Sequence, residues 1–184
     1  MKHAAIVLPV GLLLSGIVVG QPIAAQADAS KSPLLPIRNG RIPMQGVLSG
    51  GQPDQEQIAA AARAGFRTVI NLRTEKEPGF EWEAEAVVRH GMRYVLIPVA
   101  GAEGLTRDNV ERVDVALREG IESGPVLLHC GSGNRIGAIL ALRERWLKGT
   151  DPQAALQYGL AAGLTRLEPT TRELLGLSSE PKKE

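Results

Sequence analysis

The chain has 184 residues, of which 43% are hydrophobic and 22% are charged. This length and composition favour one globular domain over several. Its 21 basic and 20 acidic residues leave a net charge of +1, which argues against nucleic acid as a partner because nucleic-acid binding usually requires a basic face.

The first segment of the chain has the pattern of a secretory signal peptide. Lys2 precedes an almost wholly apolar run over residues 4–19, and the small residues around Ala27 and Ala29 fit a cleavage site. The apolar run is shorter than the roughly 20 residues of a membrane-spanning helix. We therefore expect residues 1–29 to be cleaved and the mature protein to be periplasmic or secreted, with no stable insertion in the membrane. An uncleaved N-terminal membrane anchor is the alternative.

The remaining chain divides into a linker, a domain and a tail. Prolines in residues 30–43 predict an extended linker, and the charged residues 178–184 predict a disordered tail, so the folded domain should span residues 44–177. Apolar β-branched runs predict strands over residues 44–49, 68–72, 94–99 and 125–129. Amphipathic runs with capping residues predict helices over residues 55–64, 81–90, 107–120, 136–148, 152–160 and 170–175.

The order of these elements predicts an α/β fold. Strands and helices alternate, and the strands are continuously apolar, which is typical of a largely parallel sheet with helices on both faces. We expect about four or five strands in this sheet. Because ligands bind at the carboxyl ends of parallel strands, the loops over residues 73–79, 100–105 and 130–135 should share one edge.

The third of these loops contains the single cysteine of the chain, Cys130. With one cysteine the domain must fold without an internal disulfide, and a lone thiol in an oxidising compartment is exposed to oxidation. Composition alone leaves open whether Cys130 is a reactive group or a small buried apolar residue.

The residues around Cys130 favour the reactive alternative. Gly131 and Gly133 let the backbone turn tightly, so that the amides of the loop, including those of Ser132 and Asn134, can surround an anion at the start of the next helix. Arg135 adds a planar fork of donors suited to an oxyanion. The same positive groups favour the thiolate form of the cysteine, which is the nucleophilic form.

The segment from His129 to Arg135 resembles the phosphate-binding loop of cysteine-dependent protein tyrosine and dual-specificity phosphatases. Two differences are visible. The gap between Cys130 and Arg135 is one residue shorter than usual, and Ile136 stands where those enzymes have a serine or threonine. We expect His129, as the last residue of its strand, to point away from the loop and to order it by hydrogen bonding.

Four motifs together resemble the bacterial beta-lactamase-hydrolase-like phosphatase family, which is related to the dual-specificity phosphatases. They are the segments 50–53 (Gly-Gly-Gln-Pro), 68–73 (Thr-Val-Ile-Asn-Leu-Arg), 97–99 (Ile-Pro-Val) and 128–135. The resemblance implies a dual-specificity-phosphatase-like fold and hydrolysis of phosphate monoesters, phosphotyrosine-like or small, through a phosphocysteine intermediate.

The resemblance also implies roles for particular residues. Cys130 would be the nucleophile, and Arg135 would bind the phosphate together with the loop residues Gly131, Ser132, Gly133 and Asn134. A general acid would come from the loop over residues 100–104, where relatives generally use aspartate and Glu103 is the only acid. Glu103 could equally be a solvated loop residue, and the nearby Asp108 fits a charge at a helix start better than a catalytic acid. Arg73, at the end of its strand, would contact the substrate or order its loop.

Two other functions remain open from the sequence. A rhodanese-like sulfurtransferase also places a cysteine in an amide-lined loop, and a non-catalytic module could bind phosphate or sulfate esters without hydrolysing them. Neither these functions nor a phosphatase needs a cofactor, and the three scattered histidines with one cysteine give no metal-binding pattern. The expected partner is a phosphorylated protein or small-molecule substrate.

Overall fold

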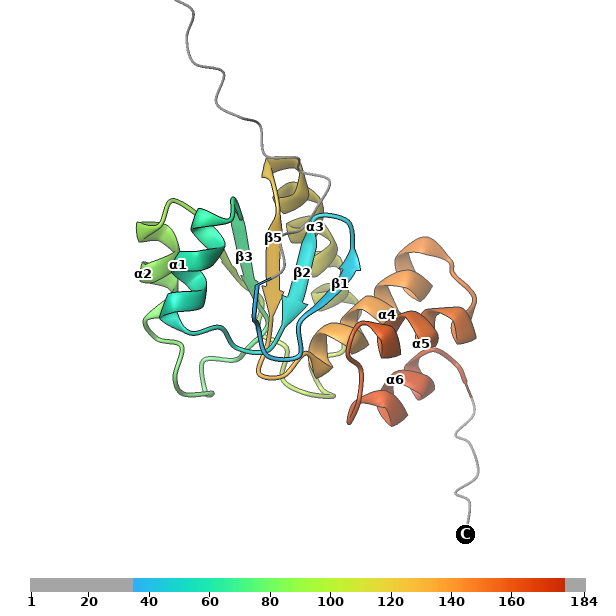
Figure 1. Cartoon of the computed structure of the whole chain (residues 1–184). Coiled ribbons are helices and arrows are strands. Elements are labelled where there is room, and N and C mark those ends of the chain that lie inside the picture. Colours follow the sequence, from blue (N-terminus) through green and yellow to red (C-terminus); the bar gives the residue numbers. More distant parts are fainter. Residues whose placement is uncertain (1–34, 178–184) are drawn as a thin grey trace, which may run out of the picture.

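The computed structural model describes residues 35–177, so the expected signal peptide over residues 1–29 and the expected tail over residues 178–184 lie outside the described residues. Within this range the protein is a mixed α/β domain with a central sheet and helices on both of its faces (Figure 1). None of the helices in residues 35–177 is long and apolar enough to span a membrane.

The sheet has five strands in the order β1-β2-β5-β3-β4. The strands are β1 (Arg41–Met44), β2 (Val47–Gly50), β3 (Thr68–Asn71), β4 (Arg93–Leu96) and β5 (Val126–His129). All neighbouring pairs are parallel except β1 and β2, which are antiparallel. The expected class of fold, a mostly parallel sheet covered by helices on both faces, is therefore confirmed.

The N-terminal edge of the sheet differs from the sequence expectation. The single strand expected over residues 44–49 is a hairpin, because Gly46 has a φ of 80° and turns the chain between β1 and β2. Part of the stretch expected to be a linker is also regular structure, since β1 begins at Arg41. The prolines of this stretch argued against regular structure, but only Pro43 lies within β1. A proline is tolerated there because β1 is an edge strand of the sheet.

Six helices surround the sheet. They are α1 (Gln55–Arg63), α2 (Glu83–Arg89), α3 (Arg107–Ser123), α4 (Asn134–Lys148), α5 (Pro152–Ala161) and α6 (Glu168–Leu174). Helices α1 and α2 cover one face, α3 and α4 cover the other, and α5 and α6 pack against α4 (Figure 1).

Successive residues of the central strands supply two separate cores. Leu48, Val69 and Leu127 pack with α1 and α2, whereas their neighbours Ile70 and Leu128 pack with the helices of the other face. This division follows from the two-residue period of a strand, which sends adjacent side chains to opposite faces. Apolar residues at consecutive positions are therefore what a sheet covered on both faces requires.

The carboxyl ends of three parallel strands meet at one edge of the sheet. In the register of the sheet, His129 at the end of β5 lies between Gly50 of β2 and Asn71 of β3. The segment that follows each of these residues is therefore brought to the same place, and these segments form the site described next.

Candidate active site

Cys130 lies at the junction between strand β5 and helix α4, in a loop that folds around its sulfur. The residue is only 1% exposed, and the backbone N–H of Gly133 donates to Cys130 Sγ at 3.1 Å. Gly133 has a φ of 93°, a conformation that L-residues rarely adopt, and α4 begins at the next residue, Asn134. The loop thus places an amide donor and the N-terminal end of a helix against the sulfur.

A cavity of about 470 Å³ opens over this loop. The loop contributes Gly131, Ser132, Asn134 and Arg135 to its lining, and other segments contribute Arg38, Glu77, Gly101, Arg166 and Leu167. Four of the expected site residues therefore share one cavity, whereas the buried Cys130 and its neighbour Gly133 belong to the same loop but are not part of the lining.

Arg135 is held by Glu77, a residue that the sequence analysis did not single out. The Glu77 carboxylate accepts hydrogen bonds from both terminal nitrogens of the guanidinium, with Nη1–Oε1 at 2.5 Å and Nη2–Oε2 at 2.8 Å. The hydrogen bond from Arg135 is the main reason that the pKa of Glu77 falls to about 2. Burial lowers the pKa of Arg135, but its interactions with Glu77 and with Cys130 outweigh this effect, and the pKa is raised. Both groups are therefore charged at neutral pH.

The remaining contacts of Arg135 fix which edge of its guanidinium is left for a ligand. Nη1 also donates to the carbonyl oxygens of Leu72, at 3.2 Å, and Val99, at 3.1 Å. Among the described residues no oxygen accepts from Nε, and Nη2 lies 3.4 Å from where a Cβ on Gly131 would be. Nη2 uses one of its two hydrogens for Glu77, so its second hydrogen and that of Nε remain available along the Nε–Nη2 edge. Such an edge can bind two oxygens of one phosphate.

Arg73 orders the loop that carries Glu77 and does not line the cavity. Its guanidinium donates to Glu77 Oε2 at 3.2 Å, to the Pro78 carbonyl at 2.8 Å and to Gln52 Oε1 at 2.8 Å. It also lies over the ring of Phe80, 4.9 Å from the ring centroid. Of the two roles that the sequence left open for Arg73, this position favours the ordering of the loop over contact with the substrate.

A buried carboxylate, Glu83, joins the strand ends beneath the loop. One of its oxygens, Oε1, accepts from Gln52 Nε2 at 2.9 Å, and the other, Oε2, accepts from Asn71 Nδ2 at 2.7 Å and from the Tyr94 hydroxyl at 3.2 Å. His129 Nε2 lies 3.0 Å from Glu83 Oε1, and both side chains are fully buried. Neither ring nitrogen of His129 makes a hydrogen bond to the described residues, so the expected ordering of the loop by hydrogen bonding from this residue is not seen. Gln52, Asn71 and His129 belong to three of the sequence motifs, so this one carboxylate explains why the motifs occur together.

Asn134 connects the cysteine loop to the segment between α5 and α6. Its Oδ1 accepts hydrogen bonds from the Thr165 N–H at 2.8 Å, the Thr165 hydroxyl at 3.0 Å and the Leu167 N–H at 3.3 Å. The side chain of Asn134 is thus used for structure, while its backbone opens helix α4. The residue between its two partners, Arg166, is exposed and lines the cavity.

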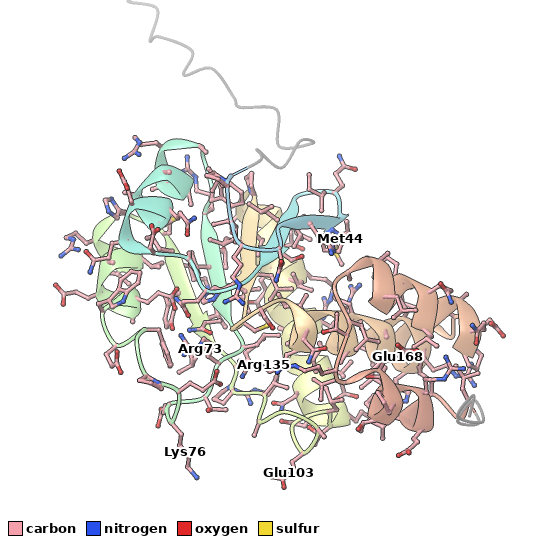
Figure 2. All side chains as sticks on the ribbon, turned by 60° about the horizontal axis from the view of Figure 1, so that its bottom comes forward. Met44, Arg73, Lys76, Glu103, Arg135 and Glu168 are labelled. Carbon is pink, nitrogen blue, oxygen red and sulfur yellow. The ribbon has the colours of Figure 1, made fainter. Side chains whose placement is uncertain are left out.

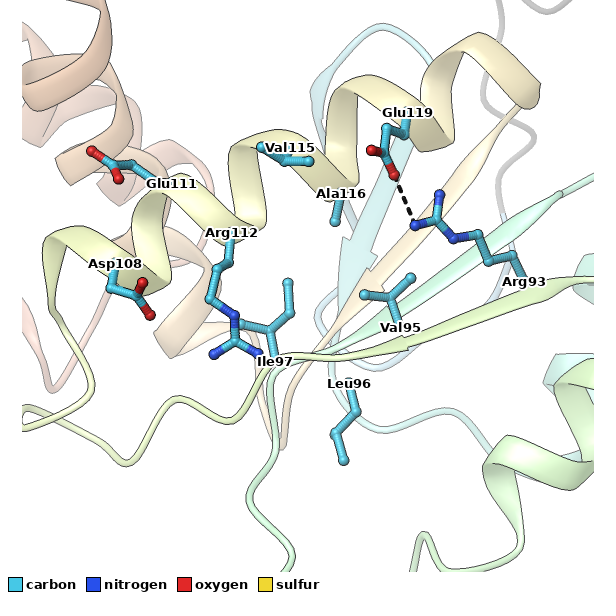
Figure 3. A pocket seen from close by; sticks show the side chains of 10 residues that line it. All are labelled: Arg93, Val95, Leu96, Ile97, Asp108, Glu111, Arg112, Val115, Ala116 and Glu119. Atoms are coloured by element: carbon cyan, nitrogen blue, oxygen red, sulfur yellow. Dashed lines mark hydrogen bonds and ion pairs between the residues drawn. The ribbon is translucent and has the colours of Figure 1, made fainter.

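Glu103 and Asp108 do not line the Cys130 cavity. Glu103 is exposed and points outward from its loop, unlike Arg135 (Figure 2). Asp108 lines a different cavity, between β4 and α3, whose walls share no residue with the Cys130 cavity (Figure 3). The position of Glu103 therefore gives no support to its expected role as general acid.

Within the described residues, no group of three or more histidine, cysteine, aspartate or glutamate side chains could hold a metal ion.

The fold is shared with solved structures of phosphatases. Comparison with known proteins gives the particular family. Residues 44–145 match the model of the beta-lactamase hydrolase-like protein, phosphatase-like domain, and since this is more than half of the chain, the protein belongs to that family.

A curated relative from Xylella fastidiosa, a beta-lactamase hydrolase-like protein, is 36% identical over 98 residues. That match covers 51% of this chain but only 22% of the relative, so the chain corresponds to a fraction of that longer protein.

Solved structures of cysteine phosphatases have the same fold. TpbA from P. aeruginosa aligns with a TM-score of 0.59 at 21% identity, covering 82% of this chain and 91% of TpbA. Tk-PTP in its active form aligns with a TM-score of 0.55 at 20% identity, covering 74% of this chain and 95% of Tk-PTP. A cysteine-to-serine form of TpbA was crystallised in complex with phosphotyrosine.

Proposed function

We propose that this protein is a cysteine-dependent phosphatase that hydrolyses phosphate monoesters through a phosphocysteine intermediate. The observation that carries the proposal is the position of Cys130: its sulfur accepts a hydrogen bond from Gly133 and interacts with Arg135, and the residues that follow it in the loop line a cavity. That arrangement can activate a thiolate and hold the anion it attacks at the same place.

The first step forms a bond from sulfur to phosphorus. The Cys130 thiolate attacks phosphorus, the bond from phosphorus to the ester oxygen breaks, and the leaving oxygen takes the electron pair and a proton from solvent. The loop amides and the free edge of Arg135 bind the nonbridging oxygens, whose negative charge they stabilise. In the second step water attacks phosphorus, the sulfur–phosphorus bond breaks, and phosphate and the thiolate are released.

The complex of the TpbA variant with phosphotyrosine supports an aryl phosphate as the first substrate to test. Phosphate esters of small molecules fit the same chemistry, because every contact inferred for the loop is made to the phosphoryl group.

One observation favours a second function, a module that binds phosphate esters without turning them over. Ile136 is completely buried in the core at the position where the resembling phosphatases carry the hydroxyl that helps the thiolate leave. Without that hydroxyl the second step lacks one source of stabilisation for the leaving sulfur.

The deciding experiment compares the wild-type protein with Cys130→Ser and Arg135→Lys. A phosphatase hydrolyses p-nitrophenyl phosphate, loses this activity in Cys130→Ser and retains little in Arg135→Lys, because lysine cannot supply a planar fork. A rhodanese-like sulfurtransferase would instead transfer sulfur from thiosulfate to cyanide. If the protein is a binding module, the wild type should show neither activity, and both the wild type and Cys130→Ser should bind phenyl phosphate in calorimetry.

The proposal extends to location: the mature protein acts in the periplasm or outside the cell. This rests on the apolar pattern of residues 1–29 in the sequence alone. N-terminal sequencing of the mature protein from a bacterial host should find a start close to residue 30. Recovery of intact protein that begins at Met1 in the cytoplasmic fraction would contradict it.

A further inference from the structure

The cavity over Cys130 contains more positive charge than one phosphoryl group requires. Three arginines line it, Arg38, Arg135 and Arg166, against a single acid, Glu77. The Glu77 carboxylate is already bonded to Arg135 and Arg73, so it does not neutralise the other two guanidinium groups.

Arg38 and Arg166 are the unpaired cations of this cavity. Both side chains are exposed, and in residues 35–177 neither one has an acidic partner or a hydrogen-bond acceptor for its guanidinium. Some exposed arginines, such as Arg93 and Arg107, pair with a glutamate, whereas others, such as Arg63, have no such partner in residues 35–177 and stand apart from any cavity that contains Cys130-loop residues. Two unpaired guanidinium groups in the wall of one cavity indicate a ligand that brings the missing negative charge.

The backbone at each arginine is fixed to the cysteine loop. On one side the Gly51 N–H donates to the Arg38 carbonyl at 2.7 Å, and Asn39 Nδ2 donates to the Ser132 carbonyl at 3.1 Å. A side chain at Gly51 would meet Arg38, because its Cβ would lie 3.3 Å from both the carbonyl oxygen and the Cβ of that residue. The glycine therefore allows the segment with Arg38 to lie against the loop.

On the other side Asn134 holds the segment with Arg166 through the three hydrogen bonds to Thr165 and Leu167. Gly137 permits this approach, because a Cβ there would lie 2.1 Å from the Leu164 nitrogen. Both arginines are thus held beside the phosphate-binding loop by contacts with that loop and with the first turn of α4.

We infer that the substrate is a small phosphate ester with a second anionic group, a bisphosphate or a phosphorylated carboxylate, whose second group binds between Arg38 and Arg166. This deepens the proposed function and rests on it for the reacting phosphate. The size of the cavity, about 470 Å³, lies in the range of roughly 300–1,000 Å³ typical of small-molecule sites, which favours a small ester over a protein segment.

The test compares two esters that differ only in the second phosphate, 4-hydroxyphenyl phosphate and 1,4-phenylene bisphosphate. After correction for its two reactive groups, the bisphosphate should have a kcat/KM about tenfold higher at low ionic strength. Added salt should reduce this advantage, because exposed charges are screened. Equal constants for the two esters would overturn the inference while leaving the phosphatase proposal intact.

Two variants locate the effect. Arg38→Gln and Arg166→Gln should each raise the KM of the bisphosphate about fivefold, and more than they raise that of the monoester. Arg63→Gln is the matched control, because Arg63 is an exposed arginine at the end of α1 and is not part of the cavity. A loss that is the same for both esters, or the same in Arg63→Gln, would contradict the assignment.

A binding measurement separates failure of the inference from failure of the proposed function. Calorimetry on Cys130→Ser should give a Kd for the bisphosphate about tenfold below that for the monoester. If the wild type hydrolyses neither ester and this preference is found, the phosphatase proposal fails and the inferred ligand class stands. If an acidic phosphotyrosine peptide depends on both arginines while the bisphosphate shows no preference, the ligand is a protein segment and the inference fails.

Discussion

The carboxylate of Glu77 and the guanidinium of Arg135 form a bidentate pair at the mouth of the cysteine loop, with Nη1–Oε1 at 2.5 Å and Nη2–Oε2 at 2.8 Å. The same carboxylate accepts from the Thr74 N–H at 2.9 Å and from Arg73 Nε at 3.2 Å. One acid in the loop after β3 therefore determines which edge of the proposed phosphate-binding arginine faces the cavity.

Replacing Glu77 with glutamine should lower the rate of phosphate ester hydrolysis. The amide can accept at one oxygen only and carries no charge, so Arg135 loses its bidentate partner. We expect kcat/KM for p-nitrophenyl phosphate to fall by about 10-fold to 100-fold, the cost of a misplaced catalytic group. Glu75→Gln is the matched control, because Glu75 is an exposed acid of the same loop. Equal activity of the two variants would show that Glu77 does not position Arg135.

The pair also predicts a pH dependence of stability. The pKa of Glu77 is lowered from 4.5 to about 2, so the folded state binds its proton less readily than the unfolded state. The resulting stabilisation is complete above the unfolded pKa and is lost as pH falls through the folded pKa. In urea denaturation, wild type should be more stable than Glu77→Gln at about pH 7, and the difference should shrink between about pH 4.5 and pH 2. A difference that stays constant over that range would contradict the assignment.

The buried side chain of Glu83 should contribute strongly to the stability of the fold. Its removal in Glu83→Ala takes away an acceptor shared by Asn71, Gln52 and Tyr94 and leaves a cavity at a fully buried position. We expect the free energy of unfolding to fall by about 3–5 kcal/mol, as for the loss of one member of a buried charged network. Glu85→Ala on the same helix should cost less than about 1 kcal/mol, because its pair with Arg89 is exposed. Urea denaturation of both variants makes the comparison.

Gly133 and Gly65 have nearly the same positive φ angle, so substitutions at the two positions distinguish backbone strain from an effect on Cys130. Gly133 and Gly65 have φ values of 93° and 91°, and a Cβ on either would meet no atom within 4 Å. Alanine at either position should therefore cost a similar strain of about 1–2 kcal/mol. Alanine keeps the N–H, but relaxation of its strained φ would turn that N–H away from the sulfur, so only Gly133→Ala should also slow the alkylation of Cys130 by iodoacetamide at neutral pH. Equal thiol reactivity in the two variants would show that this amide does not activate Cys130.

Glu103 tests whether an acid on the loop after β4 assists the leaving group. Because its side chain is exposed and outside the cavity, Glu103→Gln should change kcat by less than about twofold, whereas loss of a general acid costs about 10²–10⁴-fold. The rate for wild type should then depend strongly on the leaving group, with p-nitrophenyl phosphate hydrolysed much faster than phenyl phosphate. A large loss confined to phenyl phosphate in Glu103→Gln would restore its role as general acid.

The part of the site that could be read from the sequence is the part that is contiguous in the chain. Cys130, the glycines after it and Arg135 follow a buried strand and precede a helix, so local backbone chemistry alone suggests an anion-binding loop. Glu77 and Glu83 gave no such signal, because each is one glutamate among several in polar segments. Their importance comes from the partners they meet across the sheet edge.

The order and character of the elements, and the position of a cysteine in a glycine-containing loop between a buried strand and a helix, were determined by the sequence, because alternation, capping and glycine spacing act over a few neighbouring residues. The hairpin of β1 and β2, the orientation of Arg135 by Glu77 and the convergence of Arg38 and Arg166 on one cavity were decided by the tertiary structure. Each depends on strand register and helix packing between residues far apart in the chain, and those relations are fixed only when the two cores form on either side of the sheet.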